Sequence, residues 1–329
     1  MNKKILIHFS IKYGFLVIMA LLFIFFSITR PVFLTSSNLF SILLGITIYA
    51  ILALGETFPL IVNGMDLSIG AVASLSVMIA SYSMIVLGLH GYQAIIICLS
   101  IGACIGLING LLIVKLKIPD LLTTLGMMFL VQGLQLIPSA GRSIGNGMTL
   151  ANGKTATGVF DEGFKFLGQG RLFDIIPVPV AFMFIIAVIV FIVLSLTRYG
   201  RIFYAIGGNS EAARLVGVNI YKYRILSYII SGFVASFAGI VLAARVGRGD
   251  VSSGGTLLMD AIASALIGYA VLGAQKPNPF GTIIGAIFIG MLINGLTMLN
   301  VPYYTQDFIK GCVLVTALAF TFGLSKRKL

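Results

Sequence analysis

The chain has 329 residues, of which 59% are hydrophobic and only 10% are charged, and its mean hydropathy is +1.08. This composition excludes a water-soluble globular domain, in which about a quarter of the residues carry a charge. The net charge of +12 could suggest a nucleic-acid-binding protein, but the basic residues flank apolar runs, so nucleic acid is not an expected partner. We therefore expect an all-α integral membrane protein in contact with the lipid bilayer, folded as a single membrane domain over residues 1–329.

Apolar runs long enough to cross a hydrocarbon core of about 30 Å recur along the whole chain. The connection between the second and third runs is very short, so one of these two spans could be broken or re-entrant. We predict about ten transmembrane helices, at residues 13–28, 39–62, 68–87, 92–114, 121–137, 177–196, 223–244, 259–273, 280–299 and 305–323.

The distribution of Lys and Arg sets the expected orientation of these spans. With a cytoplasmic N-terminus, fourteen basic residues fall on the cytoplasmic side and seven on the external side. This is the bias that the positive-inside rule requires. We expect a multi-pass protein of the bacterial cytoplasmic (inner) membrane with both termini cytoplasmic. Residues 138–176 then form an external segment, either a floppy loop or a docking surface for an external partner.

An internal repeat relates the two halves of the chain. The sequence from Leu107 to Leu111 recurs identically from Leu292 to Leu296, and shorter matches flank both copies in the same order. In the expected topology the first copy runs inward and the second runs outward. This predicts an inverted-topology repeat of spans 2–5 and 7–10, and substrate paths lie at such repeat interfaces. Chance identity of short apolar words is the alternative.

A polar segment, residues 198–224, lies between the halves on the expected cytoplasmic side. Asn209 or Ser210 can cap a short helix, Glu211 suits its positive end, and Gly217 can end it in a left-handed conformation. A helix of two turns is not stable alone in water, so it must pack on its own protein or on a partner. We favour a partner.

Polar side chains within or beside the apolar spans are candidates for the translocation path. The stretch from Asn63 to Gly70 is either a tight turn, in which Asp66 caps the next helix through Ser68, or a helix break that lines the path. Asn109 and Asn294 occupy matched repeat positions and either join helices or contact a polar solute. The intramembrane carboxylate Glu56 is a functional candidate by default. The full set of path candidates is Glu56, Asn63, Asp66, Ser68, Asn109, Asp260 and Asn294.

The sequence contains no catalytic constellation, no phosphate-binding loop and no metal-ligand spacing. We therefore expect a protein that is not an enzyme and that binds no metal and no cofactor. Lys310 is not expected to pair with Glu56, which lies near the other side of the membrane; it should reach outward or pair with Asp307.

The chain resembles, over nearly its whole length, the permease subunits of ribose-type ABC importers. The resemblance is carried by Asn63-Gly64-Met65-Asp66-Leu67-Ser68-Ile69-Gly70, Thr124-Leu125-Gly126, Gly200-Arg201, Tyr204-Ala205-Ile206-Gly207-Gly208-Asn209, Ala212-Ala213-Arg214-Leu215 with Gly217-Val218-Asn219, Met259-Asp260-Ala261-Ile262-Ala263, and Gly281-Thr282 with Gly285-Ala286. Two positions depart from the family pattern: Glu56 stands where an apolar residue is usual, and Tyr269 with residues 273–279 replaces a glycine-rich turn.

The resemblance implies a dimer of identical or paralogous permease subunits, two ATPase subunits that hydrolyse ATP on the cytoplasmic side, and an external solute-binding protein. It also implies that the short helix is a coupling helix seated in the ATPase. The implied coupling residues are Gly207, Gly208, Asn209, Glu211, Ala212, Ala213, Arg214, Leu215 and Gly217.

The implied function is inward transport of a ribose-like monosaccharide or a similar small polar solute. Three alternatives stay open at this point: an ABC permease for a nucleoside, a signalling furanone or a branched-chain amino acid; a self-contained ion-coupled secondary transporter; and a membrane scaffold without transport.

Overall fold

The structure, a computed structural model, describes residues 3–149, 153, 155–271 and 276–325. The described residues are almost entirely helical, and seven helical segments are long and apolar enough to cross a membrane. The expectation of an all-α membrane protein is confirmed. The helices that contain the predicted spans are α1 (Lys3–Thr29), α2 (Ser36–Ile61), α3 (Ile69–Ser81), α4 (Gly91–Lys115), α5 (Asp120–Leu136), α7 (Val178–Phe191), α10 (Ile220–Val246), α11 (Gly255–Ala270), α12 (Pro279–Met298) and α13 (Tyr303–Ser325).

Two of these helices continue as π-helical turns. A π-turn over Tyr82–Val86 extends α3, and another over Ile192–Leu196 extends α7. Every predicted span therefore coincides with a helix. The predicted end of the eighth span, at residue 273, lies outside the described residues.

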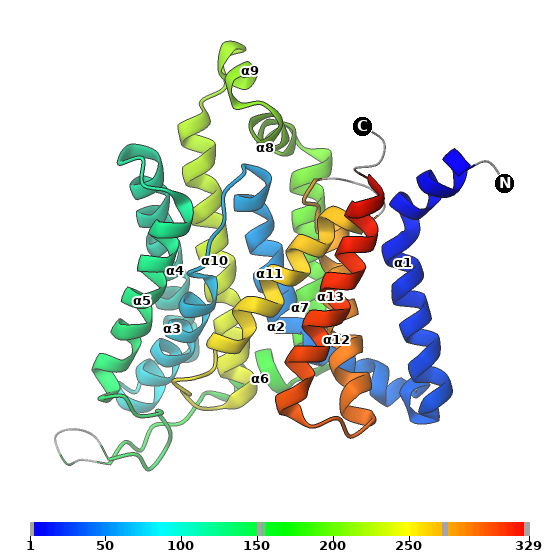
Figure 1. The fold of residues 1–329 in the computed structure, drawn as a ribbon. Coiled ribbons are helices and arrows are strands. Elements are labelled where there is room, and N and C mark those ends of the chain that lie inside the picture. Colours follow the sequence, from blue (N-terminus) through cyan, green and yellow to red (C-terminus); the bar gives the residue numbers. More distant parts are fainter. Residues whose placement is uncertain (1–2, 150–152, 154, 272–275, 326–329) are drawn as a thin grey trace.

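The two ends of the molecule carry different elements. Figure 1 shows α8 (Arg198–Gly208) and α9 (Ser210–Leu215) at the same end as the beginning of α1 and the end of α13. Residues 138–176 lie at the opposite end. This relative placement agrees with the topology expected from the basic residues.

The segment 138–176 is not a floppy loop where the structure describes it. It holds a short helix, α6 (Glu162–Gln169), and an antiparallel strand pair, β1 (Arg171–Leu172) and β2 (Ile176–Pro177). Phe160 and Phe164 are buried in a cluster with α3, α4 and α10, and the Asp161 carboxylate accepts a hydrogen bond from the N–H of Gly91. This segment therefore presents an ordered surface.

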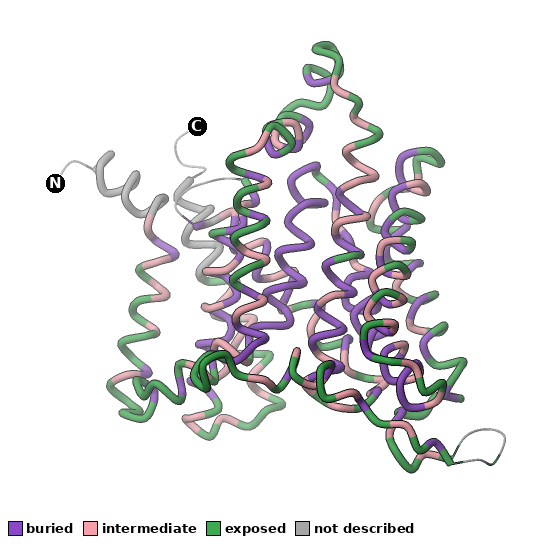
Figure 2. The backbone as a smooth tube through the Cα atoms, turned by 180° about the vertical axis from the view of Figure 1, so that it is seen from behind, coloured by how far each residue is buried: buried purple, intermediate pink, exposed green. Residues whose placement is uncertain are grey.

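The first helix of each repeat packs against helices of the other half. Helix α10, from the second half, packs against α3 and α4, whereas α2, from the first half, packs against α11 and α12. The matched helices α4 and α12 run in opposite directions (Figure 1). Close approach needs small residues, and a Cβ at Gly106 of α4 would collide with the backbone of Tyr228 in α10. Helices α2 and α10 therefore lie side by side in the interior of the helix assembly, together with the largely buried α3 (Figure 2).

The third span is broken: the short connection between α2 and α3 forms its non-helical first part, and α3 forms the rest. Helix α2 is continuous to Ile61, and the non-helical segment 62–68 then returns toward the interior before α3 begins (Figure 1). Since backbone without helical hydrogen bonds is tolerated at this depth only where protein surrounds it, the packing of this segment determines what its polar groups can do.

Candidate functional site

The first candidate region is the pair of short helices α8 and α9, at the end of the molecule that carries the chain termini. The Thr197 side chain caps α8 by accepting hydrogen bonds from the N–H groups of Tyr199 and Gly200. Phe203 and Ile206 are buried on one face of α8. Helix α8 was not predicted from the sequence. A Thr before apolar residues at helical spacing is nevertheless a signal of a helix start.

Helix α9 has the features that the sequence predicted. The Asn209 side chain caps it by accepting a hydrogen bond of 3.0 Å from the N–H of Ala212. Glu211 forms an ion pair of 2.7 Å with Arg214, and Gly217 ends the turn with a φ of +84°. At the end of the helix, Leu215 and the following Val216 are 84% and 80% exposed, so two apolar side chains project outward.

Ala213, one of the implied coupling residues, does not face outward from α9. Only 4% of it is exposed, and it packs in a cluster of its own chain with Val62, Phe203 and Ile206. Ala213 is small because it anchors α9 to the membrane domain. The surface available to a partner is therefore formed by the outward residues Leu215 and Val216.

A cleft of about 850 Å³ lies between α8, α9 and the beginning of α10. Most of the predicted coupling residues line this cleft: Gly207, Gly208, Asn209, Glu211, Arg214 and Gly217. Ala212, which is exposed on α9, and Leu215 do not line it.

At the beginning of α8, a hydrogen bond from the Arg198 guanidinium lowers the pKa of the Tyr199 hydroxyl.

Asn63 belongs to this region and not to the interior. Its backbone is left-handed, with a φ of +58°, and its side-chain amide donates a hydrogen bond of 2.8 Å to the carbonyl oxygen of Gly207. Gly207 approaches so closely that a Cβ there would collide with the carbonyl of Ile61. The prediction that Asn63 lines the path is thus replaced by a structural link between segment 62–68 and α8.

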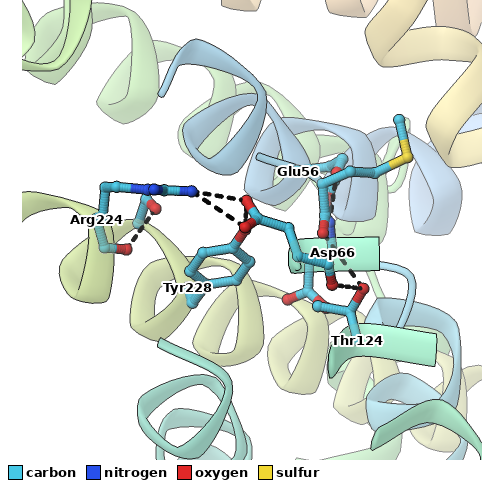
Figure 3. Close-up of polar contacts among 8 residues, drawn as sticks. Glu56, Asp66, Thr124, Arg224 and Tyr228 are labelled. Atoms are coloured by element: carbon cyan, nitrogen blue, oxygen red, sulfur yellow. Dashed lines mark hydrogen bonds and ion pairs between the residues drawn. The ribbon is translucent and has the colours of Figure 1, made fainter. Parts of the chain in front are cut away.

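The second candidate region is a buried polar group that we call the Glu56 cluster. Its members come from α2, segment 62–68, α4 and α10, and all are fully buried: Glu56, Asp66, Ser68, Asn109 and Ser231. The Glu56 Oε1 atom accepts a hydrogen bond of 2.9 Å from the N–H of Asp66. Figure 3 shows Glu56 and Asp66 facing each other across this contact.

Within the Glu56 cluster, Asp66 is the carboxylate that accepts the most hydrogen bonds. One of its oxygens accepts hydrogen bonds from the N–H and the hydroxyl of Ser68, and the other accepts one of 2.9 Å from Ser231. The Asn109 amide donates to the Ser68 hydroxyl at 3.0 Å. Asp66 therefore stabilises a tight turn through Ser68, as one sequence alternative stated, but no side chain caps α3 itself; Asn109 joins α4 to this turn.

A neighbouring ion pair lies between α10 and the beginning of α5. The Arg224 guanidinium donates to both carboxylate oxygens of Asp120, at 3.1 and 3.0 Å, and the Tyr228 hydroxyl donates to Asp120 at 2.7 Å (Figure 3). Thr124 donates to the carbonyl of Met65 at 3.3 Å. Asp120 was not among the candidate residues predicted from the sequence. The sequence feature that marks it is a lone carboxylate at the first position of a helix.

The remaining path candidates lie apart from the Glu56 cluster. Lys310 of α13 forms ion pairs of 2.7 Å with Asp260 of α11 and 2.8 Å with Asp307. The pairing with Asp307 was predicted, and that with Asp260 was missed. Asn294 donates a hydrogen bond of 3.0 Å to Asn38 and so joins α12 to α2. The predicted path residues therefore do not form a single site.

Glu56 and Tyr269, which depart from the family pattern, lie near each other in the structure. Tyr269 of α11 donates a hydrogen bond of 3.4 Å to the carbonyl of Leu60, one turn beyond Glu56 in α2. Residues 272–275 of the unusual turn lie outside the described residues.

Two inverted halves that pack against each other, buried polar groups and an exposed capped helix are features of a multi-pass membrane protein. Residues 38–318 match the family described as "Branched-chain amino acid transport system / permease component". The chain belongs to this permease family.

Named relatives agree with that membership. The chain is 34% identical over 292 residues to the ribose import permease protein of Escherichia coli K12, covering 89% of this chain and 88% of that protein. It is 32% identical over 318 residues to the D-allose transport system permease protein of the same organism, covering 96% and 93%. It is 34% identical over 273 residues to the autoinducer 2 import system permease protein of Photorhabdus laumondii, covering 83% and 78%. No solved structure matches the chain.

Proposed function

We propose that this chain is the permease subunit of a binding-protein-dependent ABC importer that carries a monosaccharide or a similar small polar solute into a bacterial cell. The relatives that import ribose and allose support the solute class. The autoinducer 2 relative keeps a non-sugar solute as an alternative within the same function.

The observation that carries the proposal is the construction of α9. The helix is capped by Asn209, ended by Gly217 and anchored by Ala213, so its position is fixed by the membrane domain. Leu215 and Val216 nevertheless project with nothing of their own chain to cover them. A fixed helix with exposed apolar side chains suits insertion into a groove of a partner. The partner would be an ATPase subunit, which supplies the ATP chemistry that this chain lacks.

The complex that we propose has two ATPase subunits, a second permease subunit, identical or paralogous, and an external solute-binding protein. The α8–α9 end would face the cytoplasm, with both termini, and the ordered segment 138–176 would face the binding protein. The coupling role falls on residues 207–217, and the path role on the Glu56 cluster with Asp260 and Asn294.

Reconstitution tests this function. The permease, its ATPase and its binding protein would be placed in liposomes, with labelled ribose outside and ATP inside. We expect sugar uptake that requires ATP and binding protein, and ATP hydrolysis that rises when the binding protein is loaded. Uptake that persists without ATP but requires an ion gradient would favour the secondary transporter, for which the buried Glu56 is the supporting observation.

A further inference from the structure

Glu56 has a carboxyl oxygen for which the structure provides no partner. Its Oε1 atom accepts the N–H of Asp66, but its Oε2 atom is buried and has no hydrogen-bond partner among the described residues. The whole residue has no exposed surface. A carboxylate in this position would be a buried charge with half of its acceptor capacity unused, which costs several kcal/mol.

Among the residues that the structure describes, no basic side chain pairs with Glu56. The closest carboxylate is Asp66, which already receives three hydrogen bonds and whose negative charge opposes a second one. The other titratable groups near Glu56 are Tyr228 from α10 and Tyr269 from α11. The guanidinium of Arg224 stands beyond Tyr228 and is already engaged by Asp120. The neighbouring helices α7 and α12 contain no charged residue at all.

Two adjacent buried carboxyl groups without a neighbouring cation share one proton. The proton stays on the group that accepts fewer hydrogen bonds. We propose that Glu56 is a proton-binding residue that, as the neutral acid, positions Asp66 and holds segment 62–68 closed. Its Oε1 atom receives the Asp66 N–H, and the proton resides on Oε2, where no donor is available.

The position of segment 62–68 gives this proton a role in transport, a part of the argument that rests on the proposed function. The same segment is bonded to α8 through Asn63 and Gly207, and to α10 through Asp66 and Ser231. When α8 and α9 move, the segment moves with them and admits water to Oε2. The O–H bond of Glu56 can then break, with the proton passing to a water molecule and a carboxylate remaining. The closed state reforms only after a proton returns.

Infrared spectroscopy tests the protonation state without any transport. The chain has only three glutamates, and the side chains of the other two, Glu162 and Glu211, are 91% and 70% exposed. The wild-type permease would be labelled with glutamate carrying ¹³C in its side-chain carboxyl group. We expect the wild-type spectrum at neutral pH to contain the isotope-shifted carbonyl band of a protonated acid. This band should be absent from the spectrum of Glu56→Gln and present in that of Glu162→Gln. A labelled wild-type protein with no such band overturns the proposal, even if no variant folds.

The consequence for transport is tested by a pH series in liposomes. Glutamine mimics the neutral acid, and its side-chain oxygen can still accept the Asp66 N–H, so Glu56→Gln should keep more uptake than Glu56→Ala, which should lose about tenfold because the Asp66 N–H loses its acceptor. Raising the pH favours the ionised form, so wild-type uptake should fall on the alkaline side while Glu56→Gln stays flat. Identical pH profiles for the two proteins overturn the inference. Failure of ATP-driven uptake in every protein, with the infrared band present, would instead count against the proposed function.

Discussion

The side-chain amide of Asn63 lies 2.8 Å from the carbonyl oxygen of Gly207, and this hydrogen bond joins the non-helical segment 62–68 to the last turn of α8. Gly207 also packs directly on the backbone of Ile61. The exposed α8–α9 unit is therefore joined to segment 62–68 and the end of α2 by this hydrogen bond, by a backbone contact and by the apolar cluster that holds Ala213 and Val62. Asp66 of the Glu56 cluster lies three residues after Asn63.

Replacing Asn63 by Gly should weaken this connection. Glycine tolerates the φ of +58° at position 63, so the substitution removes the hydrogen bond without adding backbone strain. A lost hydrogen bond of about 1 kcal/mol corresponds to roughly a fivefold decrease in solute uptake. ATP hydrolysis by the assembled complex should fall much less, because the ATPase contact is intact. Uptake and ATPase activity that stay in the wild-type ratio would contradict this link.

Ala213 and Leu215 should respond differently to the same change. Ala213→Asp places a charge in a buried apolar cluster and should lower the free energy of unfolding by several kcal/mol, because no partner for the charge is present. Leu215→Asp changes an exposed side chain, so the permease should stay as stable as the wild type while losing its ATPase during co-purification. Thermal unfolding and pull-down of both variants provide the measurement. An Leu215→Asp protein that retains its ATPase would show that α9 docks elsewhere.

The spans and the coupling helix could be predicted because their signals are local. Apolar runs of membrane length and an Asn-to-Gly capping pattern need no knowledge of distant residues. The partners of the polar residues could not be predicted, since Asp260 and Lys310 are fifty positions apart and Asn63 and Gly207 are 144 apart. Ala213 shows the same limit. A small residue on a short helix fits either its own chain or a partner, and only the packing of α9 decides between them.

The sidedness of the membrane domain can be measured with single cysteines. In a background lacking Cys98, Cys104 and Cys312, Val216→Cys and Phe173→Cys place thiols at positions that are 80% and 90% exposed, at opposite ends of the molecule. We expect a membrane-impermeant maleimide added to intact spheroplasts to label position 173 only. Permeabilised cells serve as the control, in which both positions should react. Labelling of position 216 from outside would reverse the orientation drawn from the basic residues.

The ion pair between Lys310 and Asp260 should stabilise the contact of α11 and α13 only while both partners are present. The two side chains are largely buried, with 20% and 14% of their surface exposed. Lys310→Met leaves the Asp260 carboxylate unpaired in an apolar setting and should cost about 3–5 kcal/mol of stability. Adding Asp260→Leu removes the stranded charge, so the double variant should recover most of the wild-type thermal stability. If the double variant is stable but transports no solute, Asp260 acts in the path as well as in packing. If Lys310→Met alone melts at the wild-type temperature, the pair contributes nothing to this contact.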